Sequence, residues 1–195
     1  MNDVVEALAP VVEVLEQLGV RYRIGGSVAS SALGVPRSTL DVDIACELGL
    51  AHVARFVAGL RERYYIDADM ISEAIRQRAT FNLVHLGTML KVDVFIRKGR
   101  AFDAQAFDRV TRKPLDISEG ARSFDLTTAE DIILHKLEWY RLGDEISERQ
   151  WLDLVGVLKV QASAIDVVYL RKWANELEVA DLLERALIAS GTAVL

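Results

Sequence analysis

The chain has 195 residues, of which 51% are hydrophobic and 27% are charged, with 12 glycines, 3 prolines and one cysteine. This composition is typical of a folded globular protein and excludes collagen-like, intrinsically disordered and disulfide-built chains. The formal net charge of −6 excludes a generally basic surface, so a contact with nucleic acid would have to come from a local basic patch.

Nothing in the sequence indicates a membrane or an oxidising compartment. No apolar run reaches the roughly 18 residues of a membrane-spanning helix, and the first residues lack the basic and apolar regions of a secretion signal. A single cysteine cannot form an internal disulfide, which fits a reducing environment. We therefore expect a cytoplasmic protein with no membrane partner.

The first part of the chain alternates between helical and strand patterns. Apolar residues recur at helical spacing over residues 2–18, where Pro10 predicts a kink or two short helices. Alternating apolar residues predict strands over residues 20–24 and 39–46, with a short helix over residues 27–33 between them. Helix and strand thus follow each other closely from the start.

The same alternation continues to about residue 96. Residues 50–63 return to helical spacing, and short strands are expected at 64–66 and 81–86. The clearest strand covers residues 89–96. Residues 97–126 are expected to form loops and short elements, because glycine and proline interrupt them.

From Thr128 onward the pattern is helical. Thr128 with Asp131 resembles a capping box that opens a helix to Tyr140. Further apolar stripes at helical spacing cover residues 149–160, 170–177 and 179–187, and the three tryptophans are expected in their core. The sequence thus predicts an α+β protein, with an α/β half at 1–110 and a helical half at 111–195.

Three aspartates are the candidate metal ligands. Asp41 and Asp43 are two residues apart on an expected strand, so they point the same way, roughly 7 Å apart. Unpaired, they would repel each other, and a divalent cation such as Mg²⁺ or Mn²⁺ would remove that repulsion. Asp93 lies on a later strand of the same pattern and becomes a third carboxylate if the two strands are neighbours. Three carboxylates could hold two metal ions for phosphoryl transfer.

The turn Gly25-Gly26-Ser27 is the candidate phosphate site. A strand that ends in two glycines and opens a helix at a serine presents backbone N–H groups and a hydroxyl to an anion. Arg37 is expected on the face of the aspartates, where it could also contact phosphate. Each feature alone also has a plain structural explanation, a tight turn or a solvated strand edge.

Together these residues resemble a known superfamily. The turn at 25–27 followed by RSTLDVDI at 37–44 resembles the signature of the DNA-polymerase-β-like nucleotidyltransferases. The resemblance implies that the turn holds a nucleoside triphosphate (NTP) and that the two aspartates of the signature bind Mg²⁺. It also implies that residues 91–94 form the strand of the third carboxylate.

The helical half resembles a narrower group. Residues 128–137 and 149–153 resemble the lysine helix and the aspartate helix of AbiEii-type nucleotidyltransferases, the toxins of abortive-infection toxin–antitoxin pairs. This implies essential roles for Lys136 and Asp153, an RNA or tRNA 3′ end as acceptor, and an antitoxin protein as partner. From the residues alone, a lysine on a solvated face is the commoner explanation of Lys136, and only the resemblance favours a functional role. Asp153 is equally half of a surface ion pair with Arg149, worth well under about 1 kcal/mol.

The sequence therefore predicts an enzyme that moves a nucleoside monophosphate (NMP) from a metal-bound NTP to an acceptor hydroxyl. Lys136 would counter the charge on the leaving pyrophosphate. Six lysines and arginines within residues 97–113 could meet the phosphates of an RNA acceptor. The alternative from another class is an idle nucleotide-binding or antitoxin-type module that acts by protein contact.

Overall fold

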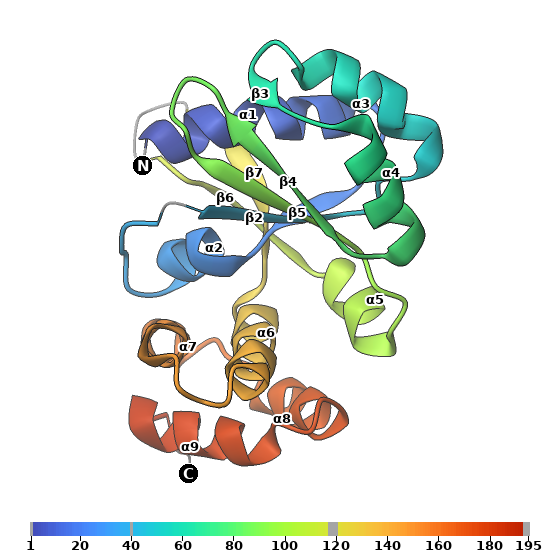
Figure 1. Cartoon of the computed structure of the whole chain (residues 1–195). Helices are drawn as coiled ribbons and strands as arrows, with labels where there is room; N and C mark the ends of the chain where they lie inside the picture. The colour runs from blue at the N-terminus through green and yellow to red at the C-terminus, as the bar shows by residue number, and fades with distance from the viewer. Residues whose placement is uncertain (1, 40, 117–120, 193–195) are drawn as a thin grey trace. The chain divides into compact units, whose positions relative to one another are not determined.

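The computed structural model describes residues 2–39, 41–116 and 121–192 (Figure 1), so Leu40 of the signature lies outside the described residues. Two compact units share the chain discontinuously. The first unit comprises Met1–Gly25 and Ser38–Leu126, and the second comprises Gly26–Arg37 and Thr127–Leu195.

The first unit is built on a seven-stranded mixed sheet with the strand order β3-β4-β5-β2-β1-β7-β6. The strands are β1 (Tyr22–Ile24), β2 (Asp41–Cys46), β3 (Tyr64–Tyr65), β4 (Thr80–His85), β5 (Lys91–Ile96), β6 (Val110–Pro114) and β7 (Ser123–Thr127). β2 runs parallel to β5 and antiparallel to β1, while β1 is parallel to β7. β4 is antiparallel to both β3 and β5.

Alternation along β2 and β5 divides the sheet into a core face and a partly solvated face. The apolar residues that alternate with the aspartates are fully buried: Val42, Ile44, Val92 and Val94. The aspartates themselves are partly exposed on the opposite face. If either strand shifted by one residue in its pairing, its carboxylates would face the core. The alternation of apolar residues therefore fixes the register of the β2–β5 pairing. The α+β, mixed-sheet prediction is confirmed.

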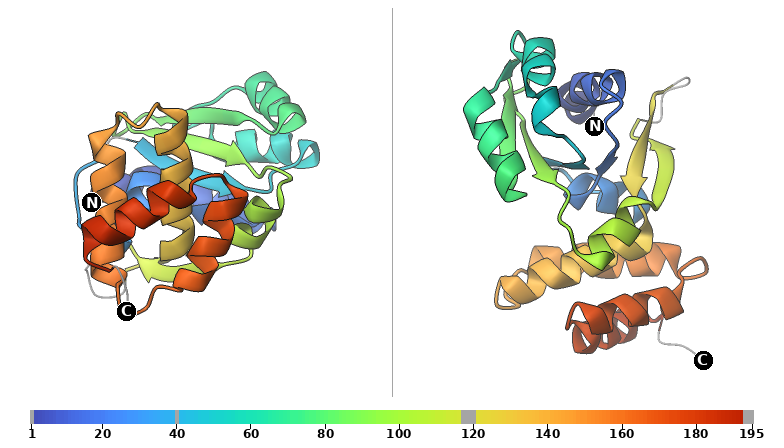
Figure 2. Two further views of the ribbon diagram at one scale, coloured as in Figure 1. Left: turned by 90° about the horizontal axis from the view of Figure 1, so that it is seen from below. Right: turned by 90° about the vertical axis from the view of Figure 1, so that its right-hand side faces the viewer.

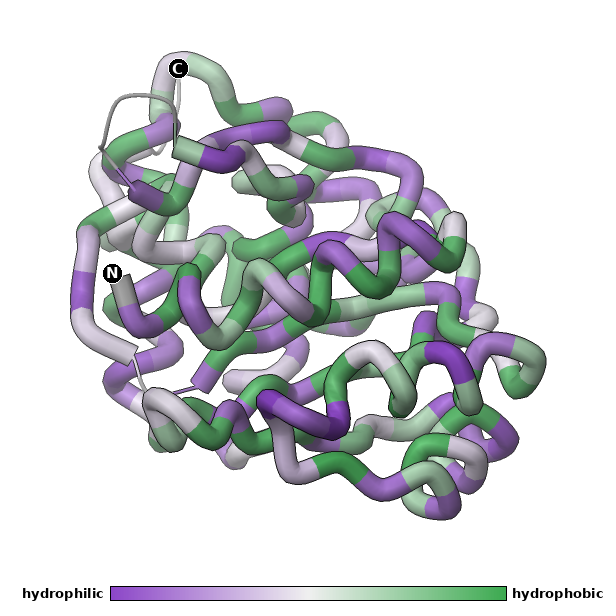
Figure 3. Tube along the Cα trace, turned by 90° about the horizontal axis from the view of Figure 1, so that it is seen from above, coloured by the Kyte–Doolittle hydropathy of each residue, from purple (hydrophilic) through white to green (hydrophobic). Residues whose placement is uncertain are grey.

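Helices cover the core face of this sheet. The helical elements of the first unit are α1 (Asn2–Gln17), a 3₁₀ turn (Leu50–His52), α3 (Val53–Leu60), α4 (Ala68–Gln77) and α5 (Ala101–Phe107). α1, α3 and α4 lie on the same face of the sheet (Figures 1 and 2). Hydrophobic and hydrophilic residues alternate along α1, which begins at the N-terminus (Figure 3).

α1 is one helix across Pro10, not two. Leu8, Val11, Val12 and Leu15 are fully buried on both sides of the proline. The packing of this apolar face outweighs the one backbone hydrogen bond that proline removes. α4 was not predicted, because Ile71 and Ala74 are the only residues that it buries and they give a weak pattern.

The second unit is entirely helical. Its helices are α2 (Gly26–Leu33), α6 (Ala129–Leu142), α7 (Glu148–Gln161), α8 (Val167–Glu176) and α9 (Ala180–Ser190). α2 packs on α6 and α7, while α8 and α9 pack on each other and on α6 and α7 respectively. The predicted cap at Thr128 forms, since its side chain accepts a hydrogen bond from the backbone of Asp131. Trp173 is buried but Trp139 is about half exposed, so the expectation of a core role was wrong for Trp139.

The units divide the chain differently from the boundary expected at residue 110. β6 and β7 lie beyond that boundary and join the sheet next to β1. Residues 26–37, expected in the α/β half, group with the C-terminal helices. The buried side of α2, which includes Val28, Ala29 and Leu33, packs against these helices.

Gly34 gives a stability test of the α2–α7 packing. A Cβ at Gly34 would lie 2.8 Å from the backbone nitrogen of Val157 and 2.9 Å from the carbonyl of Ser30. We expect Gly34→Ala to lower the free energy of unfolding by about 1–3 kcal/mol in urea titrations. The control Gly49→Ala meets nothing closer than 3.7 Å and should stay within about 0.5 kcal/mol of the parent. Equal effects of the two substitutions would contradict this packing.

Candidate active site

The first cluster of candidate site residues lies on β2 and β5 in the first unit. The in-register pairing sets Asp41 opposite Lys91 and Asp43 opposite Asp93. Because adjacent strands lie about 4.8 Å apart, in-register side chains on one face are direct neighbours. The structure thus brings the three predicted aspartates to one face of two adjacent strands.

Lys91 balances the charge of this carboxylate cluster. Its Nζ lies 2.8 Å from an oxygen of Asp93 and 3.5 Å from an oxygen of Asp41. The hydrogen bond to Asp93, with the charges of both carboxylates, raises the pKa of Lys91. The sequence alone gave Lys91 no role, because it did not reveal that both Asp93 and Asp41 lie within reach of its ammonium.

The donor set of this cluster fits a hard divalent cation, since it consists of carboxylate oxygens that already share one positive group. Within residues 2–39, 41–116 and 121–192, no three His, Cys, Asp or Glu side chains are gathered closely enough to hold a metal ion. The Lys91 side chain is 43% exposed. A cation could therefore take its place between the carboxylates while Lys91 turns to solvent.

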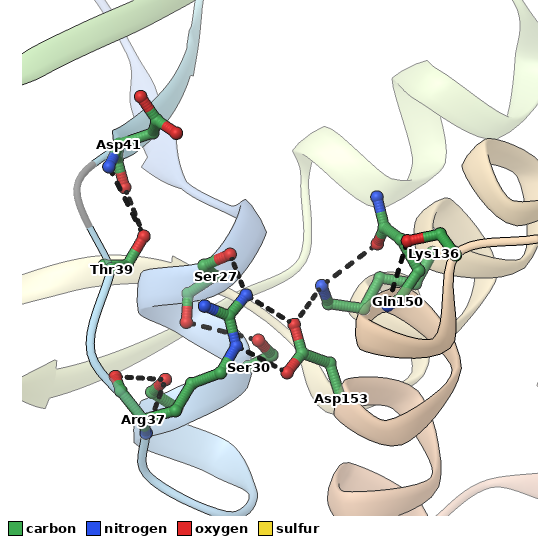
Figure 4. Close-up of polar contacts among 10 residues, drawn as sticks. Ser27, Ser30, Arg37, Thr39, Asp41, Lys136, Gln150 and Asp153 are labelled. Atoms are coloured by element: carbon green, nitrogen blue, oxygen red, sulfur yellow. Dashed lines mark hydrogen bonds and ion pairs between the residues drawn. The ribbon is translucent and has the colours of Figure 1, made fainter. Parts of the chain in front are cut away.

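The second cluster lies within the second unit and joins α2, α6, α7 and the segment that ends at Arg37 (Figure 4). Arg37 donates from Nε to one oxygen of Asp153, at 2.7 Å, and from Nη2 to the other, at 2.8 Å. Lys136 donates from Nζ to Asp153 at 2.8 Å. The side chains of Asp153 and Lys136 are only 6% and 7% exposed, so this is a buried carboxylate between two cations.

Two polar side chains complete the second cluster. Arg37 Nη2 donates to the hydroxyl oxygen of Ser27, at 2.5 Å, and Lys136 Nζ donates to Gln150 Oε1, at 3.2 Å. Ser27 lies in the first turn of α2, directly after Gly26, whose φ of +54° is a conformation that glycine adopts readily. Gln150 was missed from sequence, although it lies one helical turn before Asp153 on α7.

Charge dominates the protonation of Asp153. Burial alone would raise the pKa of Asp153, but hydrogen bonds from Arg37 and Lys136, together with their charges, outweigh it and hold that pKa below its ordinary value. The hydrogen bond to Asp153 in turn raises the pKa of Arg37. Asp153 and Arg37 are therefore both charged at neutral pH.

These contacts decide between the interpretations left open for the helical residues. Asp153 is not half of a surface pair with Arg149, since it is buried and bonds Arg37, 116 residues away. Lys136 is not a solvated lysine. Arg37 does not share a strand face with the aspartates, because β2 begins only at Asp41 and the guanidinium is bound to Asp153 and Ser27.

The basic segment at 97–113 is partly neutralised. Arg97 pairs with Glu47 at 2.9 Å, and Arg100 with Asp103 at 2.6 Å. On β6, Arg112 lies 3.7 Å from Asp125 but keeps 67% of its side chain exposed. Of these three arginines, Arg112 therefore has the most exposed side chain.

Solved structures show which fold this is. An antigenic nucleotidyltransferase-like protein from Paracoccidioides brasiliensis is similar with a TM-score of 0.56 at 16% identity, over 97% of this chain and 94% of its own. The antibiotic-resistance factor ANT(2″)-Ia, in complex with adenylyl-2″-tobramycin, is similar with a TM-score of 0.56 at 13% identity, over 91% of this chain and 98% of its own. No family model and no curated protein sequence matches the chain.

The chain therefore has the nucleotidyltransferase fold. At identities below 20% the likeness concerns the fold alone, and the chemistry has to be argued from the two clusters. No helix in the described part of the chain is long and apolar enough to cross a lipid bilayer.

The second cluster predicts a specific pH dependence of stability. Because the pKa of Asp153 is lower folded than unfolded, its pairing stabilises the fold above the unfolded value of about 3.9. That contribution is lost as the pH falls through the lowered folded pKa. We expect Asp153→Asn to destabilise the protein by about 3 kcal/mol at pH 7, because the buried Lys136 and the partly buried Arg37 lose their carboxylate.

The stability gap between the parent and Asp153→Asn should narrow as the pH is lowered from 5 to 2 in urea titrations. The control is Asp181→Asn, which breaks the exposed ion pair with Arg141. It should leave stability nearly unchanged at every pH. A gap between the parent and Asp153→Asn that does not vary with pH would contradict the assigned pairing.

Proposed function

We propose that this protein is a nucleotidyltransferase that moves an NMP from a metal-bound NTP to an acceptor hydroxyl. The observation that carries the proposal is the set of three carboxylates on one face of in-register parallel strands, in a chain with the nucleotidyltransferase fold. Three carboxylates with one ammonium leave an excess of negative charge, which a divalent cation would neutralise and which an idle binding module would not need.

The carboxylate cluster is assigned to metal binding and activation of the acceptor. Asp41 and Asp43 hold Mg²⁺ or Mn²⁺, and Lys91 yields its position between the carboxylates. When bound, the metal ion neutralises phosphate charge and polarises the phosphoryl oxygens. Asp93 completes the metal site and accepts the proton of the attacking hydroxyl.

The second cluster is assigned to the phosphates. The backbone N–H groups of Gly26 and Ser27, with the Ser27 hydroxyl, bind the β- and γ-phosphates at the start of α2. Gly25 positions this turn, because its N–H donates to the carbonyl of Asp43 at 2.9 Å. The acceptor oxygen bonds to the α-phosphorus as the bond to the bridging oxygen breaks, and pyrophosphate leaves. Lys136 counters the charge on that leaving group.

For the acceptor we propose an RNA 3′ end, as the resemblance to AbiEii-type toxins implies. The support is twofold: Lys136 and Asp153, the two residues singled out by that resemblance, are paired and buried. In addition, Arg112 on β6 keeps 67% of its side chain exposed. An antitoxin protein that silences the enzyme is the partner that this assignment implies.

Metal and nucleotide binding can be tested together by thermal shift. With Mg²⁺ and an NTP at about 100 times its Kd, the melting temperature should rise by roughly 5 °C or more, because binding stabilises only the folded chain. Asp41→Asn combined with Asp43→Asn should abolish the metal-dependent part of this shift. Lys91→Met should instead lower the Mg²⁺ concentration required, since no ammonium then competes for the carboxylates.

The control for the thermal shift is Asp69→Asn, which removes one exposed carboxylate on α4. It should shift with Mg²⁺ and NTP like the parent. If the Mg²⁺-dependent rise in melting temperature were unchanged in the Asp41→Asn/Asp43→Asn variant, the metal assignment would be wrong. Transfer itself is measured by incubating the protein with each labelled NTP, Mg²⁺ and total cellular RNA.

The acceptor can be tested through its salt dependence. If RNA lies along the basic segment, log Kd should change with log salt by about 0.7 per phosphate contact, and reversal of Arg109, Arg112 and Lys113 to Glu should reduce that slope. The same variant should bind NTP like the parent, because neither cluster includes these residues. Fluorescence anisotropy with a labelled single-stranded RNA measures both quantities.

A charge-matched control reverses Arg55, Arg61 and Arg63, three exposed arginines on and after α3. It should weaken RNA binding much less than the β6 variant. Equal losses in the two variants would show that only the overall charge matters. Transfer of label to a small molecule and never to RNA would reject the RNA acceptor but not nucleotidyl transfer.

A further inference from the structure

We propose that Arg37 and Asp153 are positioning residues that aim the hydroxyl hydrogen of Ser27 at a phosphate, and that Arg37 does not itself contact the substrate. This inference rests on the proposed function, because it specifies how the second cluster receives the phosphates. It is carried by the hydrogen bonds within the second unit, from Asp153 through Arg37 to Ser27 (Figure 4).

The direction of the bond between Arg37 and Ser27 follows from chemistry. A guanidinium carries only donors, so the Ser27 oxygen must accept from Arg37 Nη2. A hydroxyl has a single hydrogen, and with the oxygen engaged on one side that hydrogen is directed to another acceptor. Ser27 is partly exposed in the first turn of α2, where the backbone N–H groups also favour an anion.

Asp153 fixes the guanidinium that makes this bond. Two parallel bonds, of 2.7 Å and 2.8 Å, hold Arg37 at Nε and Nη2, and this fork geometry leaves the guanidinium little freedom to rotate. The backbone of Arg37 is also tied to α2, since its N–H donates to the Ser31 hydroxyl at 3.4 Å. The same Nη2 that binds Asp153 is the donor to Ser27, so the position of the carboxylate sets the position of the hydroxyl.

This arrangement separates the two cations of the cluster. Arg37 donates hydrogen bonds from Nε and Nη2 to Asp153 and Ser27. Lys136 donates to Asp153 and Gln150 from an ammonium group that can rotate. The ammonium can exchange a partner for a phosphate oxygen as a point charge, whereas the fork of two bonds to Asp153 holds the guanidinium in the orientation that serves Ser27. Arg37 therefore acts through Ser27, while Lys136 remains the cation for the substrate.

A double-mutant cycle distinguishes action through Ser27 from direct contact. The probe is pyrophosphate without metal, titrated by calorimetry, because it requires neither the carboxylate cluster nor an acceptor. Ser27→Ala and Arg37→Lys should each weaken pyrophosphate binding by about 10-fold, the scale of one hydrogen bond to a charged group. The double variant should be weakened little beyond either single variant, because both remove the same bond.

Direct contact by Arg37 predicts the opposite result, in which the two losses multiply to about 100-fold, and that outcome overturns the proposal. Arg37→Lys keeps a cation beside Asp153, which limits damage to the fold. All three tryptophans of the chain lie in the second unit, so their fluorescence reports whether it stays folded. Arg141→Gln, which removes an exposed cation of the same unit, should bind pyrophosphate like the parent.

The same samples separate failure of this inference from failure of the proposed function. A parent protein that transfers label from an NTP but binds no pyrophosphate would overturn the inference alone. A parent protein that neither binds pyrophosphate nor transfers an NMP would overturn the proposed function and the inference together. Loss of binding in both single variants with no further loss in the double variant supports the relay from Asp153 to Ser27.

Discussion

The parallel, in-register pairing of β2 with β5 is the constraint on which the candidate chemistry depends. Each strand alternates a buried aliphatic side chain with a polar one, and the pairing aligns the two alternations. Hydrophobic burial on the core face thereby fixes the positions of the carboxylates on the other face. Asp43 and Asp93 are neighbours because Val42 and Val92 are buried, so the stability of the sheet and the geometry of the cluster have one cause.

The features that could be predicted from the sequence were those that produce a repeating pattern of residues within a short segment. Alternation along β2 and β5 predicted the strands and the face of the aspartates, and the turn at 25–27 predicted the start of α2. The bond between Arg37 and Asp153 spans 116 residues and has no local pattern, so sequence reasoning could assign each residue a role but not its partner. Trp139 was misplaced because periodicity marks a helical face without showing what covers it.

The two clusters are opposite in charge. In the first unit one ammonium pairs with two of the three carboxylates, whereas in the second unit one carboxylate lies between two cations. The first cluster has an excess of negative charge and suits a cation, and the second has an excess of positive charge and suits an anion.

The discontinuity of the units restricts how this gene can be divided. The chain passes from one unit to the other three times, after Gly25, after Arg37 and after Leu126. A shortened chain that ends near Leu126 would retain α2 but lose α6 and α7, against which α2 is packed. Neither unit therefore corresponds to a single contiguous segment that could be expressed alone or removed by truncation. An exchange with a homologue by recombination would have to transfer both units together.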